Sequence, residues 1–226
     1  MNTKININHQ QKQKLFLLMF LLTITCLGIG CLRIHFAENT KGLFLAWNLF
    51  LAWIPFLTSY YISKKQLQLN KLKIIPPLLL WLLFLPNAPY IITDLVHLHP
   101  RAGVPFWYDS SALFLFAFHG LLLGIISTLF IHEVLEKHFT KFVSWIILLI
   151  SFILCGFGVY LGRFQRWNSW DLLLNPIELI ENSILKLTSP VAILVTGIFS
   201  LLFLISYLIV YQLIHLKGTS YDTKIA

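Results

Sequence analysis

Apolar and polar stretches alternate along the chain, and their lengths set the predicted architecture. Each of six stretches runs for 18 to 24 residues without an Asp, Glu, Lys or Arg. An α-helix needs about 20 residues to cross the hydrocarbon core of a bilayer, because each residue adds about 1.5 Å. The sequence therefore predicts an all-α integral membrane protein, a bundle of about six transmembrane helices, with spans at 15–32, 43–62, 74–92, 111–131, 142–162 and 191–214.

No polar stretch between or after these spans is long enough for a soluble domain, so residues 1–226 are predicted to form a single polytopic membrane domain. Composition agrees, because 58% of the residues are hydrophobic and 12% are charged, whereas soluble domains carry about 25% charged residues. This hydrophobicity excludes intrinsic disorder, and three cysteines in 226 residues exclude a small disulfide-bonded scaffold.

The first apolar stretch follows two lysines, as the core of a secretory signal would. A signal core usually has about 7–15 apolar residues and is followed by small residues at a cleavage site. Residues 15–32 are longer than that and lead to Arg33, so we expect an uncleaved helix. Cleavage of this segment stays open as an alternative.

Basic residues are distributed unevenly over the loops, which predicts the orientation. If the N-terminus is cytoplasmic, the inner segments hold 11 of the 17 basic residues, whereas six of the nine acidic residues lie outside. Cytoplasmic loops are enriched in Lys and Arg, so both termini are predicted to be cytoplasmic. The net charge of +8 then faces the inner surface of the lipid bilayer, and we expect no nucleic acid partner.

The third span contains two prolines close to its outer end, Pro86 and Pro89. Proline has no amide hydrogen, so the carbonyl groups of Leu82 and Leu85 lose their usual donors and need other partners in lipid. Asn87 lies between the prolines. The pattern indicates either a hydrated cavity beside a broken helix or a kink that neighbouring helices seal.

Two predicted outer loops carry most of the chemically versatile side chains, and the topology places both on one face. The loop after the third span contains Asp94, His97 and His99, followed by Trp107, Tyr108 and Asp109. The loop after the fifth span contains Arg163, Arg166, Trp167, Asn168, Trp170 and Asp171. We expect the two loops to form a polar cluster.

Four strings in these regions are similar to a known family. They are LPNAPYIITDL at 85–95, PFWYD at 105–109, GVYLGRF at 158–164 and RWNSWD at 166–171. Together they resemble a bacterial family of multi-pass membrane proteins, the domain of unknown function 1361 (DUF1361), over about residues 40–215. The resemblance implies a multi-pass protein of the bacterial cytoplasmic (inner) membrane, and it implies no activity.

The loop residues suggest binding or modification of an anionic envelope lipid or a lipid-linked phosphate. Arginine forks pair well with phosphate, so the anion-binding candidates are Arg163, Arg166 and Asn168, with the arginines on one edge of a helix extension. The candidate catalytic residues are Asp94, His97 and Asp109, because a carboxylate aided by an imidazole can act as a general base. Supporting residues are Asn87, Trp107, Tyr108, Trp167, Trp170 and Asp171.

The alternative is a non-enzymatic scaffold or a small-solute transporter. In that case the cluster is a structural salt-bridge network, in which Arg163 and Arg166 pair with Asp94, Asp109 or Asp171. The predicted spans offer few polar groups, among them His119, and no charged residue, which argues against ion-coupled pumping. Asp94, His97 and His99 are a weak metal candidate without a recognised zinc spacing, so no cofactor is predicted, and the question of enzyme activity stays open.

Overall fold

A computed structural model of the chain describes residues 7–37, 42–65, 70–99 and 104–222. Most of these residues are helical, and none of them forms a strand. Among the described residues, six helical segments are long and apolar enough to cross a membrane. They are α1 (His9–Ala37), α2 (Leu43–Lys65), α3 (Lys71–Phe84) continued by α4 (Asn87–Tyr90) and η1 (Ile91–His97), α5 (Phe106–His138), α6 (Lys141–Phe164) and α9 (Pro190–Asp222). The prediction of an all-α multi-pass membrane protein is confirmed.

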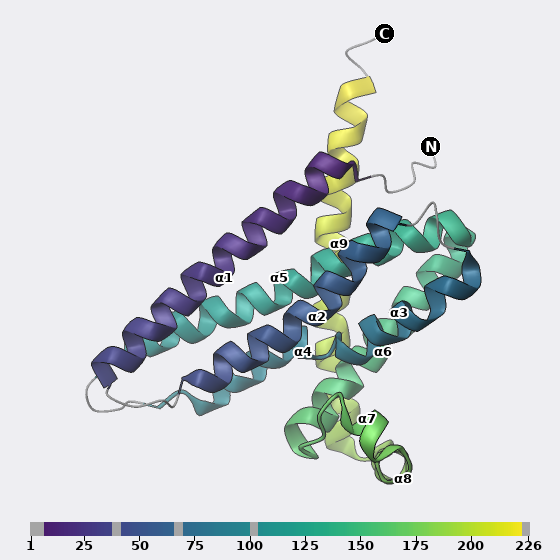
Figure 1. Cartoon of the computed structure of the whole chain (residues 1–226). Helices are drawn as coiled ribbons and strands as arrows, with labels where there is room; N and C mark the ends of the chain where they lie inside the picture. Colours follow the sequence, from purple (N-terminus) through teal and green to yellow (C-terminus); the bar gives the residue numbers. More distant parts are fainter. Residues whose placement is uncertain (1–6, 38–41, 66–69, 100–103, 223–226) are drawn as a thin grey trace.

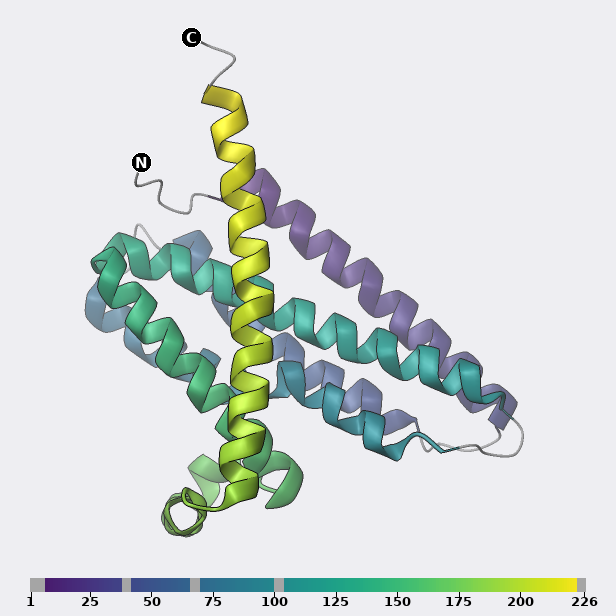
Figure 2. The same ribbon diagram turned by 180° about the vertical axis from the view of Figure 1, so that it is seen from behind.

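α5 forms the centre of the bundle and packs against α1, α2, α4, α6 and α9 (Figures 1 and 2). Within the most apolar window of each helix, 72% of the residues of α5 are buried, against 11% for α1 and for α9. The two terminal helices therefore present most of their apolar surface to lipid. The start of α1 and the end of α9 lie at the same end of the bundle, as an even number of crossings requires.

Two short helices, α7 (Asp171–Leu174) and α8 (Pro176–Lys186), lie at the opposite end, between α6 and α9 (Figure 1). The sequence pattern predicts only a loop there. α8 has no buried residue, so its hydrophobic residues do not contribute to the core of the bundle.

Glycines let the broken third crossing pack closely between α5 and α6. A Cβ atom on Gly120 of α5 would lie 2.7 Å from the carbonyl oxygen of Ala88, and one on Gly158 of α6 would lie 2.5 Å from Cγ of Pro86. Both distances are shorter than van der Waals contact. Small residues permit such close approach of helices in membranes, and here they position the proline break.

α5 extends seven residues beyond the predicted end of the fourth span at Ile131. The additional turns contain His132, Glu133 and Glu136. These residues are buried, with exposed fractions of 0%, 1% and 2%. The sequence pattern assigns these polar residues to a loop, because charged residues such as Glu133 and Glu136 usually mark the end of an apolar span. They remain in the helix because neighbouring helices supply partners inside the bundle.

Candidate functional site

The third crossing breaks at its prolines, and this break positions the candidate site. α3 ends at Phe84, and α4 begins at Asn87. The side-chain amide of Asn87 donates hydrogen bonds to the carbonyl oxygen of Phe84 at 3.0 Å and to Ser169 Oγ at 2.9 Å. Asn87 therefore satisfies a backbone carbonyl at the break and ties the broken helix to the segment after α6.

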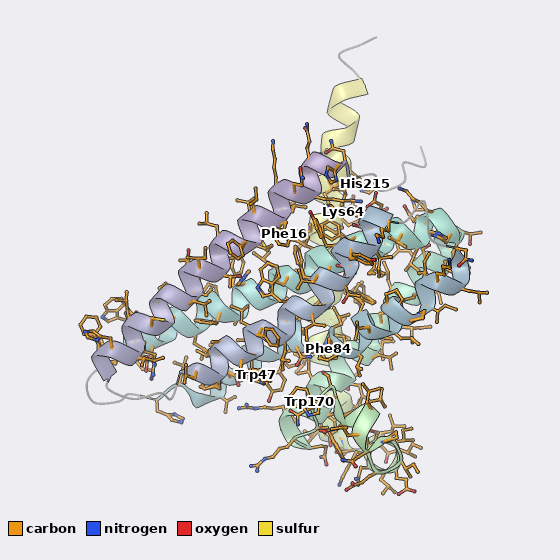
Figure 3. All side chains as sticks on the ribbon, in the orientation of Figure 1. Phe16, Trp47, Lys64, Phe84, Trp170 and His215 are labelled. Carbon is orange, nitrogen blue, oxygen red and sulfur yellow. The ribbon has the colours of Figure 1, made fainter. Side chains whose placement is uncertain are left out.

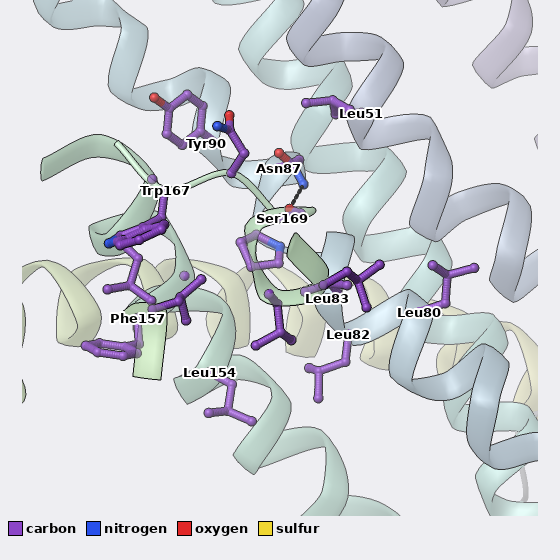
Figure 4. A pocket seen from close by; sticks show the side chains of 18 of the residues that line it. Leu51, Leu80, Leu82, Leu83, Asn87, Tyr90, Leu154, Phe157, Trp167 and Ser169 are labelled. Carbon is purple, nitrogen blue, oxygen red and sulfur yellow. Dashed lines mark hydrogen bonds between the residues drawn. The ribbon is translucent and has the colours of Figure 1, made fainter. Parts of the chain in front are cut away.

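A cavity of about 860 Å³ lies beside the break, between α2, α3, α6 and the segment that includes α7 (Figure 4). The structure thus has a cavity on one side of the break, whereas α5 and α6 pack closely against the break. The polar part of its lining consists of Asn48, Asn87, Tyr90, Arg166, Asn168 and Ser169. Most of the remaining lining is apolar and includes Leu79, Leu80, Leu82, Leu83, Leu154 and Phe157.

The cavity opens sideways at the apolar surface of the bundle. Leu79 of α3 and Leu173 of α7 line it and are 60% and 73% exposed. Because Leu79 belongs to a helix that is long and apolar enough to cross a membrane, we expect the opening to face lipid. The cavity thus joins an apolar, open side to a polar end.

Arg166 is at the polar end and has an unusual backbone conformation. α6 ends at Phe164, and Arg166 has a φ of 60°, while the amide of Trp167 donates to the carbonyl oxygen of Leu161 at 3.2 Å. This is the geometry of a helix end that usually has glycine at the left-handed position. The two arginines therefore do not share a helix edge, in contrast to the sequence prediction, because the helix stops between Arg163 and Arg166.

Arg163 and Asp94 form an ion pair, and neither residue lines the large cavity. Asp94 is 3% exposed, and its carboxylate accepts hydrogen bonds from Asn48 Nδ2 at 3.0 Å and from Arg163 Nη1 at 3.3 Å. Arg163 thus forms one of the ion pairs that the structural alternative expects. Arg166 forms no ion pair with a carboxylate in the part of the chain that the structure describes.

Asp109 belongs to a second, smaller chamber. Arg33 of α1 binds its carboxylate in bidentate fashion, with Nε–Oδ1 at 2.7 Å and Nη2–Oδ2 at 3.2 Å. The chamber has a volume of about 50 Å³ and is lined by Arg33, Asp94, His99 and Asp109, among others. The predicted polar cluster is therefore divided between this chamber, with the two carboxylates, and the large cavity, with Arg166 and Asn168.

The tryptophans and Asp171 shape the polar end of the large cavity. Asp171 Oδ2 accepts from the backbone amide of Asn168 at 2.7 Å and from its side chain at 3.3 Å, which closes the turn before α7. Trp167 lines the cavity. Trp170 packs edge-to-face on Trp47 of α2, with ring centroids 6.3 Å apart (Figure 3).

Two other predicted residues lie away from the cavity. Trp107 and Tyr108 are at the start of α5 beside α1, where the Tyr108 hydroxyl donates to the carbonyl oxygen of Ile29 at 2.8 Å. His97 is the last residue of η1, and its side chain lies outside the described part of the structure. Within the described residues, no three or more His, Cys, Asp and Glu side chains are grouped so that they would hold a metal ion.

The structure contains a buried ionic cluster at the end of the bundle opposite the cavity. The sequence analysis does not predict this cluster. Lys12 of α1 lies 2.7 Å from Glu133 of α5, with side chains 5% and 1% exposed. Next to it, Nδ1 of His132 and the hydroxyl oxygen of Tyr207 of α9 are 2.5 Å apart. The only sequence signal is the spacing of His132 and Glu136, four residues apart on one helix face, directly after an apolar span.

These features define a multi-pass α-helical membrane protein with a lateral cavity beside a proline break. The chain belongs to the family described as protein of unknown function, DUF1361, whose model matches residues 47–206. The matched range contains every residue that lines the large cavity and leaves α1 outside. No curated protein and no solved structure matches the chain.

Proposed function

We propose that the protein binds an anionic lipid, with the head group at Arg166 and the acyl chains along the leucines of α3 and α6. The observation that carries this proposal is the shape of the large cavity. It has a lipid-facing apolar side and a polar end at which Arg166 has no carboxylate partner among the described residues. An amphiphile that enters from the membrane fits this division, whereas a water-borne solute would meet mostly leucine.

The backbone of Arg166 supports a functional role for its side chain. A non-glycine residue in the left-handed conformation costs about 1–2 kcal/mol. Glycine would relieve this cost at the end of α6, so the fold alone does not favour arginine at this position. A guanidinium group that binds phosphate would explain why the strained residue is an arginine.

The geometry favours binding over acid–base catalysis. Asp94 is held by Asn48 and Arg163, and Asp109 is held by Arg33. Both carboxylates thus act in the structure as acceptors for neighbouring cations and amides. We further propose that the protein is in a bacterial cytoplasmic membrane with α7 and α8 on its outer side, which the uneven distribution of lysine supports.

The variant Arg166→Gly tests the binding proposal, because it removes the guanidinium while relieving the backbone strain. We expect purified Arg166→Gly protein in nanodiscs to bind fluorescent phosphatidylglycerol about tenfold to hundredfold more weakly. This is the effect expected when one or two charge-assisted hydrogen bonds are lost. Its melting temperature should be equal to or higher than that of the unchanged protein. Lys186→Ala, which removes an exposed cation of α8 outside the cavity, should leave binding unchanged.

Two competition measurements test which chemical groups of the lipid are recognised. Phosphatidylcholine should not compete with the fluorescent lipid, because it has no net negative charge. Water-soluble glycerol phosphate should not compete either, because it lacks the acyl chains. Unchanged phosphatidylglycerol binding by a folded Arg166→Gly variant would contradict the proposal, and so would full competition by glycerol phosphate.

A further inference from the structure

α8 has a stripe of isoleucines that the described part of the chain leaves uncovered. Ile177, Ile180 and Ile184 are three and four residues apart, so they share one face of the helix. They are 73%, 49% and 60% exposed. Apolar surface left in water costs about 25 cal/mol per Å², which favours a partner that covers the stripe.

The stripe points away from the bundle. Leu179 and Asn182, on the other side of α8, are only partly exposed, and Leu179 lines the large cavity. Both views show α8 almost along its axis, whereas α6 and α9 extend across the picture (Figures 1 and 2). α8 therefore lies crosswise to the helices that cross the membrane, at one end of them.

The charge of α8 indicates how it would contact a membrane. Its charged residues are Glu178, Glu181 and Lys186, so the helix has a small negative charge. A helix of this kind is held at a bilayer by buried apolar area, and anionic lipids do not attract it. Trp167 and Trp170 precede it, and tryptophan is enriched at the boundary between lipid and water.

We propose that α8 is an interfacial helix whose isoleucine stripe lies in the lipid leaflet at this end of the bundle. Leu172 of α7 and Leu179 of α8 are part of the cavity wall, so an α8 placed in this way would lie between the cavity and that leaflet. If the binding function proposed above holds, the bound lipid enters from the same leaflet. The interfacial position itself does not depend on that function.

Spin labels at two positions of α8 test the proposal on the full-length chain. Ile184→Cys places a label on the stripe, and Glu178→Cys places a matched label on an exposed residue outside it. Both variants carry Cys31→Ser, because Cys31 is exposed whereas Cys26 and Cys155 are buried. The protein is reconstituted in phosphatidylcholine vesicles, and the accessibility of each label to oxygen and to a water-soluble nickel chelate is measured.

We expect the ratio of oxygen to nickel accessibility to be several-fold higher at position 184 than at position 178. The ratio should not change when phosphatidylglycerol is added to the vesicles. Equal access of nickel to both labels would overturn the proposal, and so would a label at 184 that neither reagent reaches, because that result indicates a protein partner. The lipid-binding proposal is tested separately, by the binding measurement on the Arg166→Gly variant. That measurement does not involve the label at position 184, so the two proposals can fail independently.

Discussion

At the scale of single residues, buried polar groups are held by specific partners that lie far away in the sequence. Lys12 and Glu133 form such a pair, and Lys12 also donates to the carbonyl oxygen of Ser63 at 3.1 Å. Lys137 lies 3.6 Å from Glu133 and is partly exposed. Loss of Lys12 would therefore remove the closest cation from a carboxylate that is 1% exposed, while Lys137 stays 3.6 Å away.

We predict that Lys12→Met lowers the free energy of unfolding by about 3 kcal/mol, because breaking a buried ion pair leaves a buried carboxylate without its closest cation. The double variant Lys12→Met with Glu133→Leu should recover most of this loss, since both charges are then replaced by apolar groups. Titration with SDS from mixed micelles measures both values. If the double variant is as unstable as Lys12→Met, the ion pair is not the cause of the loss.

The sequence predicts part of this residue-scale picture. It indicates that Asn87, between two prolines, belongs to a break that needs new hydrogen-bond partners. It does not indicate Ser169, which is 82 residues away and reaches Asn87 only because α6 packs on the broken helix. Likewise, the arginines of the outer loops are predicted, but only the end of α6 decides that Arg163 pairs with Asp94 and that Arg166 faces the cavity.

At the scale of elements, contact between helices is set by a few small residues. Gly158 of α6 faces the ring of Pro86, which itself lines the large cavity. A methyl group at this position would overlap the ring, which cannot rotate away as a flexible side chain does. The site therefore depends on a close approach of two helices that only glycine permits.

We predict that Gly158→Ala destabilises the protein by about 1–3 kcal/mol, the usual range for overpacking a well-packed contact. Gly28→Ala is the matched control, because a Cβ atom at Gly28 would have no neighbour within 4 Å. The control should be neutral or slightly stabilising, since alanine favours the helix more than glycine does. Thermal unfolding followed by circular dichroism compares the two variants, and equal melting temperatures would contradict the expected contact.

At the scale of the whole molecule, α1 is attached to α5 at three depths. Lys12 pairs with Glu133 at one end, and Arg33 pairs with Asp109 at the other. Between them, Thr23 Oγ1 lies 2.8 Å from Nε2 of His119. His119 thus takes part in an interhelical hydrogen bond, and α1 is held by polar contacts although most of its apolar surface faces lipid.

We predict that the two ends of the bundle lie on opposite sides of the membrane, with the end of α2 in the cytoplasm. In bacterial cells that produce Cys31→Ser protein, Glu178→Cys should react with a membrane-impermeant maleimide. Lys65→Cys should react only after permeabilisation. Labelling of both positions in intact cells, or labelling in the reverse order, would contradict the orientation that the lysine distribution predicts.

The sequence by itself determined the class of the protein, the six apolar segments and the position of the break in the third crossing. These are local properties, because the length of an uncharged stretch and the missing amide of proline act over a few neighbouring residues. Only the tertiary structure decided that α5 continues through buried charges, that α8 lies crosswise, and that the predicted cluster divides into a chamber and a cavity. Those outcomes depend on which helices touch, and contacts between residues more than 70 positions apart are a property of packing in three dimensions.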